Sequence, residues 1–248
     1  MLDLKEYRYW KPIPTITEWL STRVIKPGDR VVDVGCGHCP FPRADVGVDR
    51  LPRSVLEGIW DKLQVNSRPP VLCHHDFGVA PMPFKDKEFD FVYCRHTLED
   101  MYDPFLLLCD MQRIGKAGYI ETPSPVVELT KGVDGYQNSW KWRGYFHHRF
   151  LVWWSGGADN ELRFVSKYPI VEHYEFPEEK LEAPLCNGAD LWNTYYLWKD
   201  EIKWRHFDCP FDFTALGYQE FLWLAAVESG RSVSDFCHMV NEQMQQVA

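Results

Sequence analysis

The stretch "DRVVDVGCGHCPFPRADVGVDR", residues 29–50, decides the fold. Its β-branched run "VVDV" is typical of a buried strand, and it leads into Gly35 and Gly37, the start of a nucleotide-binding turn. A second apolar run follows after only eight residues, "HCPFPRAD". A parallel crossover normally needs about a dozen residues with a helix, and Pro42 disfavours helical geometry at Phe41. We therefore predict a first crossover without its helix, or with about one turn of it.

Downstream of this stretch, strand and helix patterns continue to alternate. Such alternation predicts an α/β fold, a Rossmann-like doubly wound and mostly parallel sheet, with ligands bound at the carboxyl ends of the strands. Further strands are expected at "PPVLCHHDF" (69–77), "FDFVYCR" (89–95) and "AGYIETPSP" (117–125), and helices at "LPRSVLEGIWDKL" (51–63) and "LEDMYDPFLLLCDMQRI" (98–114), the latter broken at Pro104.

The second half of the chain is different in kind. Beyond about residue 125 the alternation is lost, aromatic residues become frequent, and "TALGYQEFLWLAAVESG" begins a tail that we expect to form two helices. At 248 residues the chain has room for one elaborated α/β domain. We predict a single domain over residues 1–248, with a ligand-binding core at 29–125 and a cap with C-terminal helices at 126–248.

The composition of the chain argues against some classes of binding partner. The net charge of −9 argues against a general nucleic-acid coat, and no run approaches the roughly eighteen apolar residues of a membrane span. The N-terminus carries no signal-peptide core. The eight cysteines are mostly scattered along the chain, and we expect them to be reduced thiols. We expect a cytoplasmic protein that does not bind membranes, and its charge disfavours nucleic acid as a partner. Its oligomeric state is not indicated.

The trimmed crossover also restricts the ligand. A dinucleotide places its pyrophosphate on a helix N-terminus, and here both that helix and the third glycine of GxGxxG are missing, because Pro40 occupies that position. A ligand without a phosphate group loses less binding free energy when this helix is absent. S-adenosylmethionine (SAM), an adenosine joined to methionine through a sulfonium, is such a ligand.

Four segments in order, "VVDVGCG", "GVD", "CHHDF" and "MPFKDKEFDFVYCRHTLEDMYDP", together with "GYIETPSP", resemble the class I SAM-dependent methyltransferases. The resemblance is to the methyltransferase type 11 branch with a shortened first crossover. It covers about residues 29–125 and implies SAM as the cofactor. It also implies which residues bind each part of SAM. The turn on the methionine side would be formed by Asp33, Gly35, Cys36 and Gly37, with Arg95 and His96 beside the methionine portion. Asp49 would accept the ribose hydroxyls, and Asp76 and Phe77 would contact the adenine.

A metal site is the competing interpretation of the strand ends. Soft ligands gather there in the sequence: Cys36, His38, Cys39, Cys73, His74, His75, Cys94 and His96. Side chains that alternate across a sheet rarely converge, and buried free cysteine is a common core residue. We therefore predict no metal.

The acceptor side is expected in "NSWKWRGYFHHRFLVWW", residues 138–154. If this segment is extended, neighbouring side chains face opposite sides, and we favour His148, sharing a face with Phe146, over His147 as the general base. Glu121 and Glu128 are the competing carboxylates for the role of general base.

We predict a SAM-dependent methyltransferase that acts on a small-molecule acceptor, with a hydroxyl of a sugar or metabolite as the first choice. The alternatives are a catalytically silent methyltransferase-like binding module and a nucleic-acid methyltransferase.

Overall fold

The computed structural model describes residues 14–135, 138–156, 159–187, 191–207 and 214–234. These residues fall into two compact units. The sheet unit comprises residues 14–121 and 197–202, and the C-terminal unit comprises the described parts of 122–196 and 203–234. The division at residue 121 lies close to the predicted end of the ligand-binding core. That the whole chain acts as one domain stays a prediction.

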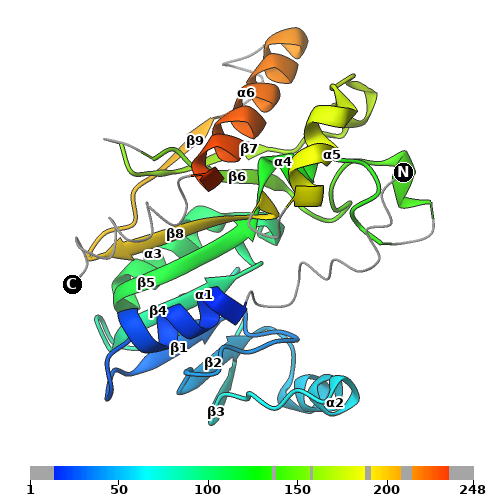
Figure 1. The fold of residues 1–248 in the computed structure, drawn as a ribbon. Coiled ribbons are helices and arrows are strands. Elements are labelled where there is room, and N and C mark those ends of the chain that lie inside the picture. The colour runs from blue at the N-terminus through cyan, green and yellow to red at the C-terminus, as the bar shows by residue number, and fades with distance from the viewer. Residues whose placement is uncertain (1–13, 136–137, 157–158, 188–190, 208–213, 235–248) are drawn as a thin grey trace. The chain divides into compact units, whose positions relative to one another are not determined.

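The sheet unit is built on a six-stranded sheet with the order β3-β2-β1-β4-β5-β8, drawn in Figure 1. Its strands are β1 (Val31–Val34), β2 (Val46–Asp49), β3 (Val71–His74), β4 (Phe89–Arg95), β5 (Gly115–Pro123) and β8 (Asn193–Lys199). The pairs β1–β2, β1–β4, β2–β3 and β4–β5 are parallel. β1 is buried at all four positions, as expected for a central parallel strand covered on both faces. The predicted α/β fold with a mostly parallel sheet is confirmed.

The helices of this unit follow the sequence signals. They are α1 (Pro14–Trp19) with a π-helical extension Leu20–Val24, α2 (Arg53–Leu63), a 3-10 helix Leu98–Asp100 and α3 (Pro104–Ile114). Asp103 caps α3 by accepting hydrogen bonds from the backbone N–H groups of Phe105 and Leu106. Pro104 occupies the first turn, where a missing N–H costs nothing. The predicted break at Pro104 is therefore present.

The C-terminal unit has a sheet of its own, of three strands in the order β6-β7-β9. β6 and β7 are antiparallel, and β7 and β9 are parallel. Its elements are α4 (Pro125–Leu129), the 3-10 helix Ser139–Lys141, β6 (Phe150–Trp154), β7 (Leu162–Ser166), the 3-10 helix Pro169–His173, α5 (Glu178–Asn187), β9 (Trp204–Phe207) and α6 (Ala215–Ser234).

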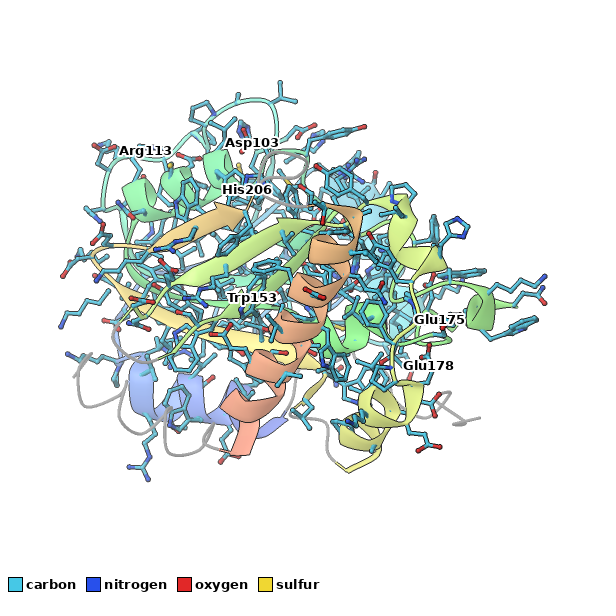
Figure 2. The ribbon with its side chains drawn as sticks, turned by 90° about the horizontal axis from the view of Figure 1, so that it is seen from above. Asp103, Arg113, Trp153, Glu175, Glu178 and His206 are labelled. Atoms are coloured by element: carbon cyan, nitrogen blue, oxygen red, sulfur yellow. The ribbon has the colours of Figure 1, made fainter. Side chains whose placement is uncertain are left out.

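Aromatic side chains fill the core of the C-terminal unit. Trp153 of β6 lies beside α6 (Figure 2), with its ring centroid 5.8 Å from that of Phe221 and 6.1 Å from that of Phe207. The predicted first C-terminal helix corresponds to α6, and the second falls outside the described residues. Within the described part of the chain, no helix is long and apolar enough to cross a membrane.

Candidate functional site

The glycine turn after β1 is tied directly to the end of β2. Gly35 and Gly37 both have positive φ, 76° and 38°, which favours glycine over residues with a Cβ. The N–H of Gly35 donates to the carbonyl of Val48. One oxygen of the buried Asp49 carboxylate accepts from the N–H of Gly37 at 2.9 Å, and the other accepts from the N–H of Leu51 at 2.8 Å. Asp49 thus fixes the turn around which the cofactor is predicted to bind.

Glycine is also required at position 35 because a neighbouring side chain packs closely against it. A Cβ on this residue would lie 2.1 Å from the hydroxyl oxygen of Thr97, which follows β4. The Thr97 side chain therefore packs directly on the backbone of Gly35. At Gly37 a Cβ would meet only the Gly35 carbonyl, at 3.6 Å. Among the described residues, this part of the turn therefore leaves room for an atom at the Cβ position.

The shortened crossover is held by Asp33. Residues 35–45 contain turns and no helix, as predicted. A carboxylate oxygen of Asp33 accepts from the N–H of Phe41 at 2.7 Å, and the Phe41 ring stacks on Tyr93 with centroids 4.3 Å apart. The indole N–H of Trp60 donates to the Gly37 carbonyl at 2.8 Å. Side chains thus replace the missing helix as the support of the loop.

The environment of Asp33 also changes its acidity. Burial raises the pKa of this carboxyl to about 7, although the Phe41 N–H and the Arg95 guanidinium partly oppose the rise. Asp33 therefore changes its ionisation near neutral pH. Its predicted second role, contact with the methionine amino group, stays a prediction.

The end of β3 carries the pair predicted to contact adenine. Asp76 is exposed and Phe77 is half-buried. The Asp76 side chain accepts from the N–H of Gly78 at 3.0 Å, and the backbone N–H of His75 donates to the Asp49 carbonyl. Asp49 and Asp76 thus lie at the carboxyl ends of adjacent strands, where ligands of parallel sheets bind.

A buried ionic group joins the ends of β4 and β5. Nε of Arg95 lies 2.8 Å from Glu121, and the Tyr119 hydroxyl donates to the second Glu121 oxygen at 2.7 Å. The His96 imidazole lies 3.6 Å from Glu121 and 3.4 Å from Glu99. Burial alone would raise the pKa of Glu121, but Arg95, His96 and Tyr119 outweigh it and lower the pKa to about 2. So acidic a carboxyl is a weak base at neutral pH, which favours an anchoring role for Glu121.

The sulfur and nitrogen ligands of the competing metal interpretation are dispersed. Among the described residues, the cysteines and histidines at the strand ends form no group of three with ligand atoms within 4.8 Å of one another. Burial also raises the pKa of the Cys36 and Cys94 thiols well above their usual value. A neutral thiol is a poor metal ligand, because the thiolate is the form that binds.

The C-terminal unit contains the histidines predicted to act on the acceptor, and one expectation about them is wrong. Residues 146 and 147 form a turn, and β6 begins only at Phe150. The N–H of His148 donates to the Tyr145 carbonyl at 3.3 Å, a bond that an extended chain would not form. His148 is buried, whereas Phe146 and His147 are exposed, so Phe146 does not share an environment with His148.

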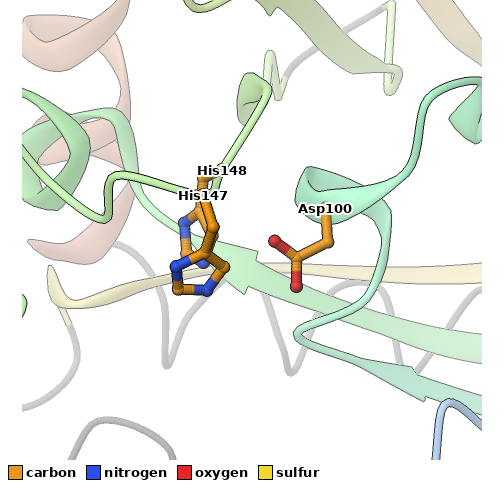
Figure 3. A group of neighbouring side chains, drawn as sticks. All are labelled: Asp100, His147 and His148. Carbon is orange, nitrogen blue, oxygen red and sulfur yellow. The ribbon is translucent and has the colours of Figure 1, made fainter.

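Figure 3 shows His147 and His148 as neighbours on one loop; Asp100, also labelled there, belongs to the sheet unit. The two imidazole rings lie 4.5 Å apart at an angle of 78°. Although the extended geometry was wrong, the two histidines do differ in exposure. Their catalytic roles stay predictions.

His148 belongs to a buried group of three charged or titratable side chains. Its Nδ1 lies 2.7 Å from one oxygen of Glu128, and Nζ of Lys167 lies 2.7 Å from the other. Burial would raise the pKa of Glu128, but Lys167 and His148 lower it to about 2. Sequence reasoning named Glu128 and His148 as competitors and missed Lys167. No local signal could have found Lys167, because it lies 39 residues from Glu128.

Comparison with known proteins assigns a class to the sheet unit. Residues 32–120 match the family model described as a methyltransferase domain. Solved structures that match part of this chain include the YcgJ protein of Bacillus subtilis (18% identity, TM-score 0.34, covering 44% of this chain and 50% of that one). A SAM-dependent methyltransferase of Aquifex aeolicus matches at 16% identity and a TM-score of 0.36 (50% and 75% covered). A third, from Mesorhizobium loti, matches at 21% and 0.34 (46% and 57% covered).

Scores and identities this low carry no functional argument, and the chain spans only half the length of the Bacillus subtilis protein. A comparison with curated proteins gives no significant match. The class therefore rests on the family model and on the motifs in their observed places. Residues 32–120 are a class I SAM-dependent methyltransferase domain, and the cofactor of this class is SAM. The residues present fit that cofactor, since a glycine turn, a strand-end carboxylate at Asp49 and a second carboxylate at Asp76 stand along one edge of the sheet.

Proposed function

We propose that this protein transfers a methyl group from SAM to a hydroxyl of a small molecule, a sugar or metabolite. One observation carries the choice of a hydroxyl acceptor: the buried imidazole of His148, whose Nδ1 lies 2.7 Å from Glu128. A hydroxyl is a weak nucleophile until a base takes its proton, and an imidazole oriented by a carboxylate suits that task.

The sheet unit would hold the cofactor. Gly35, Cys36 and Gly37 would carry the methionine side over the turn, with Asp33, Arg95 and His96 nearby. Asp49 has two acceptor oxygens for the ribose hydroxyls, and each already accepts one backbone N–H, so each keeps a lone pair. Asp76 and Phe77 would border the adenine.

When bound, SAM supplies a methyl group on its sulfonium, and the electron pair of the broken sulfur–carbon bond stays on sulfur. His148 would accept the hydroxyl proton at Nε2 as the new oxygen–carbon bond forms. The remaining task of the protein is to align the reactants and to exclude water.

Charge and thiol chemistry support the other parts of the proposal. The net charge of −9 disfavours a nucleic-acid acceptor. Cys36, Cys73, Cys94 and Cys109 form no disulfide bond, which is consistent with the cytoplasmic location that we propose.

A methyltransferase-like module that only binds a partner is the second candidate, and one observation favours it. Trp140 and Phe146 expose 56% and 68% of their surface, and the exposed Lys141, His147 and Arg149 lie in the same segment. Exposed aromatic and basic side chains together are a common feature of binding surfaces.

Incubation of the pure protein with methyl-labelled SAM and fractionated cell extract tests the proposal. We expect label in a small-molecule fraction, attached through oxygen. Label in nucleic acid, or SAM binding in calorimetry without transfer to any fraction, would contradict it. Calorimetry should also give binding of SAM and none of NAD.

A further inference from the structure

The buried Glu128 side chain receives two partners, one on each oxygen. It projects from α4, which Ser124 caps and whose residues are all buried. One carboxylate oxygen faces Nδ1 of His148 and the other faces Nζ of Lys167, both at 2.7 Å. The side chains of Glu128, His148 and Lys167 are 0%, 2% and 6% exposed, so bulk water cannot substitute for either partner.

This arrangement determines which imidazole nitrogen carries the proton. A carboxylate is an acceptor only, so a nitrogen at hydrogen-bond distance from it must be a donor. The neutral His148 ring therefore has its proton on Nδ1 and its lone pair on Nε2. A base needs such a lone pair, and a fixed tautomer keeps it on one atom.

Lys167 is fixed as firmly as Glu128. Its Nζ donates to the carbonyl oxygens of Arg143 and Tyr145, both at 2.9 Å, in addition to Glu128. All three donors of the ammonium group are therefore used. Gly144, between the two carbonyl residues, packs directly on α4, because a Cβ there would lie 2.4 Å from a Glu128 oxygen. The loop that carries His148 is thus fastened to Glu128 by backbone as well as by side chains.

We propose that Glu128 and Lys167 are positioning residues that hold His148 with its proton on Nδ1 and its lone pair on Nε2. In catalysis, which rests on the proposed function, Nε2 receives the acceptor's hydroxyl proton and becomes N–H. Glu128 keeps no proton and stabilises the resulting imidazolium. Lys167 compensates the carboxylate charge while the imidazole is neutral, so the group changes from net zero to one positive charge.

Removing Glu128 and removing Lys167 should shift the pH midpoint of His148 protonation in opposite directions. Glu128→Gln removes the anion that stabilises the imidazolium, so the pH midpoint of His148 should fall by about one unit or more. Lys167→Gln removes the cation but keeps an N–H donor, so the midpoint should rise. The rings of Tyr145 and His147 lie beside this histidine, with centroids 4.7 Å and 4.5 Å from its own, and both variants leave them in place.

Imidazole ¹⁵N–¹H NMR on the full chain tests the tautomer and the midpoints, with His148 assigned by its loss in His148→Gln. We expect a protonated Nδ1, a lower midpoint in Glu128→Gln and a higher one in Lys167→Gln. Glu228→Gln is the matched control, because Glu228 also accepts from a ring N–H, that of Trp153, and from a cation, Arg163. It should leave His148 unchanged. A proton on Nε2, or midpoints that do not separate in opposite senses, would overturn the proposal.

Turnover with methyl-labelled SAM and the extract fraction provides the second readout. Glu128→Gln should lower kcat by about 10²-fold, with the KM for SAM unchanged and the rising limb of the pH profile displaced to lower pH. Unchanged kcat in this variant, alongside the expected NMR tautomer, would overturn the catalytic role and leave the buried group structural. Absence of turnover in the wild-type protein would instead contradict the proposed function, while the NMR result still decides the tautomer.

Discussion

The buried carboxylates at the glycine turn of the sheet unit are held in a different way from Glu128 of the C-terminal unit. In the sheet unit, Asp33 and Asp49 accept backbone N–H groups, from Phe41, Gly37 and Leu51. In the C-terminal unit, Glu128 is held by the side chains of His148 and Lys167. Carboxylates bound to backbone determine the shape of a loop, whereas a carboxylate bound to side chains determines where protons and charges reside. In the proposed function, Asp33 and Asp49 would shape the cofactor site, and Glu128 would determine the protonation of His148.

The same contrast appears in acidity. Burial raises the pKa of Asp33 to about 7, and the Arg95 guanidinium opposes the rise without reversing it. Glu128 is equally buried, but Lys167 and His148 bring its pKa to about 2. Burial alone therefore does not decide whether a carboxyl is ionised; the partner does.

The largest expected effect is on turnover. His148→Gln should lower kcat by about 10²–10⁴-fold if the imidazole is the base, while the affinity for SAM in calorimetry stays the same. His147→Gln is the control on the same loop and should change little, because that ring is exposed. Near-normal turnover in both variants would show that neither histidine is the general base.

A smaller effect is expected on stability. It distinguishes a carboxylate held by backbone N–H groups from one held by charged side chains. Because the pKa of Asp33 is higher in the folded chain than its usual 3.8, its ionisation opposes folding increasingly as pH rises from about 4 to about 7. Asp33→Asn should therefore stabilise the protein by at most about 4 kcal/mol at pH 8, and by a smaller amount, at most about 1.6 kcal/mol, at pH 5. Thermal unfolding at both pH values measures this. Equal effects at the two pH values would mean that Asp33 ionises normally.

Ligand affinity should respond to Asp49 more modestly. Asp49→Asn keeps the shape but removes the charge and one acceptor, so SAM affinity should fall by about 1.5–3 kcal/mol, roughly 10- to 10²-fold. Asp49→Ala should weaken binding further and also loosen the turn, because Gly37 and Leu51 lose their acceptor. Calorimetry that gives unchanged affinity for both variants would place the ribose elsewhere.

Chelation should have the smallest effect. Exhaustive treatment with a chelator should leave methyl transfer intact, since the proposed chemistry uses an imidazole base. Loss of activity that added zinc or iron restores would assign part of the proton chemistry to a metal instead.

Sequence reasoning predicted the sheet unit well, because the decisive signals there are local. The short crossover was readable from the eight residues before Val46 and from Pro42, and the helix break from Pro104. The carboxylate contacts with Phe41, Gly37 and Leu51 also span short sequence distances, 8, 12 and 2 residues. Backbone preferences and nearby partners determine such features.

The C-terminal unit was predicted less well, and the histidine loop shows why. Alternation along "FHHRFLVWW" assumed an extended chain, but the Tyr145–His148 hydrogen bond turns the loop before β6 begins. The aromatic composition was visible in the sequence, whereas the sheet β6-β7-β9 that it packs against was not. Nonlocal pairing overrides a local periodicity of only a few residues.

The sequence by itself therefore determined the α/β class, the trimmed first crossover and the glycine turn with its acids at the strand ends. Only the tertiary structure decided that Glu128, His148 and Lys167 meet, and that His148 rather than His147 is buried. The physical reason is distance along the chain. A turn or a cap is stabilised by residues a few positions apart, but a buried ionic group forms only where packing brings distant segments out of water together, so that each charge must find a partner.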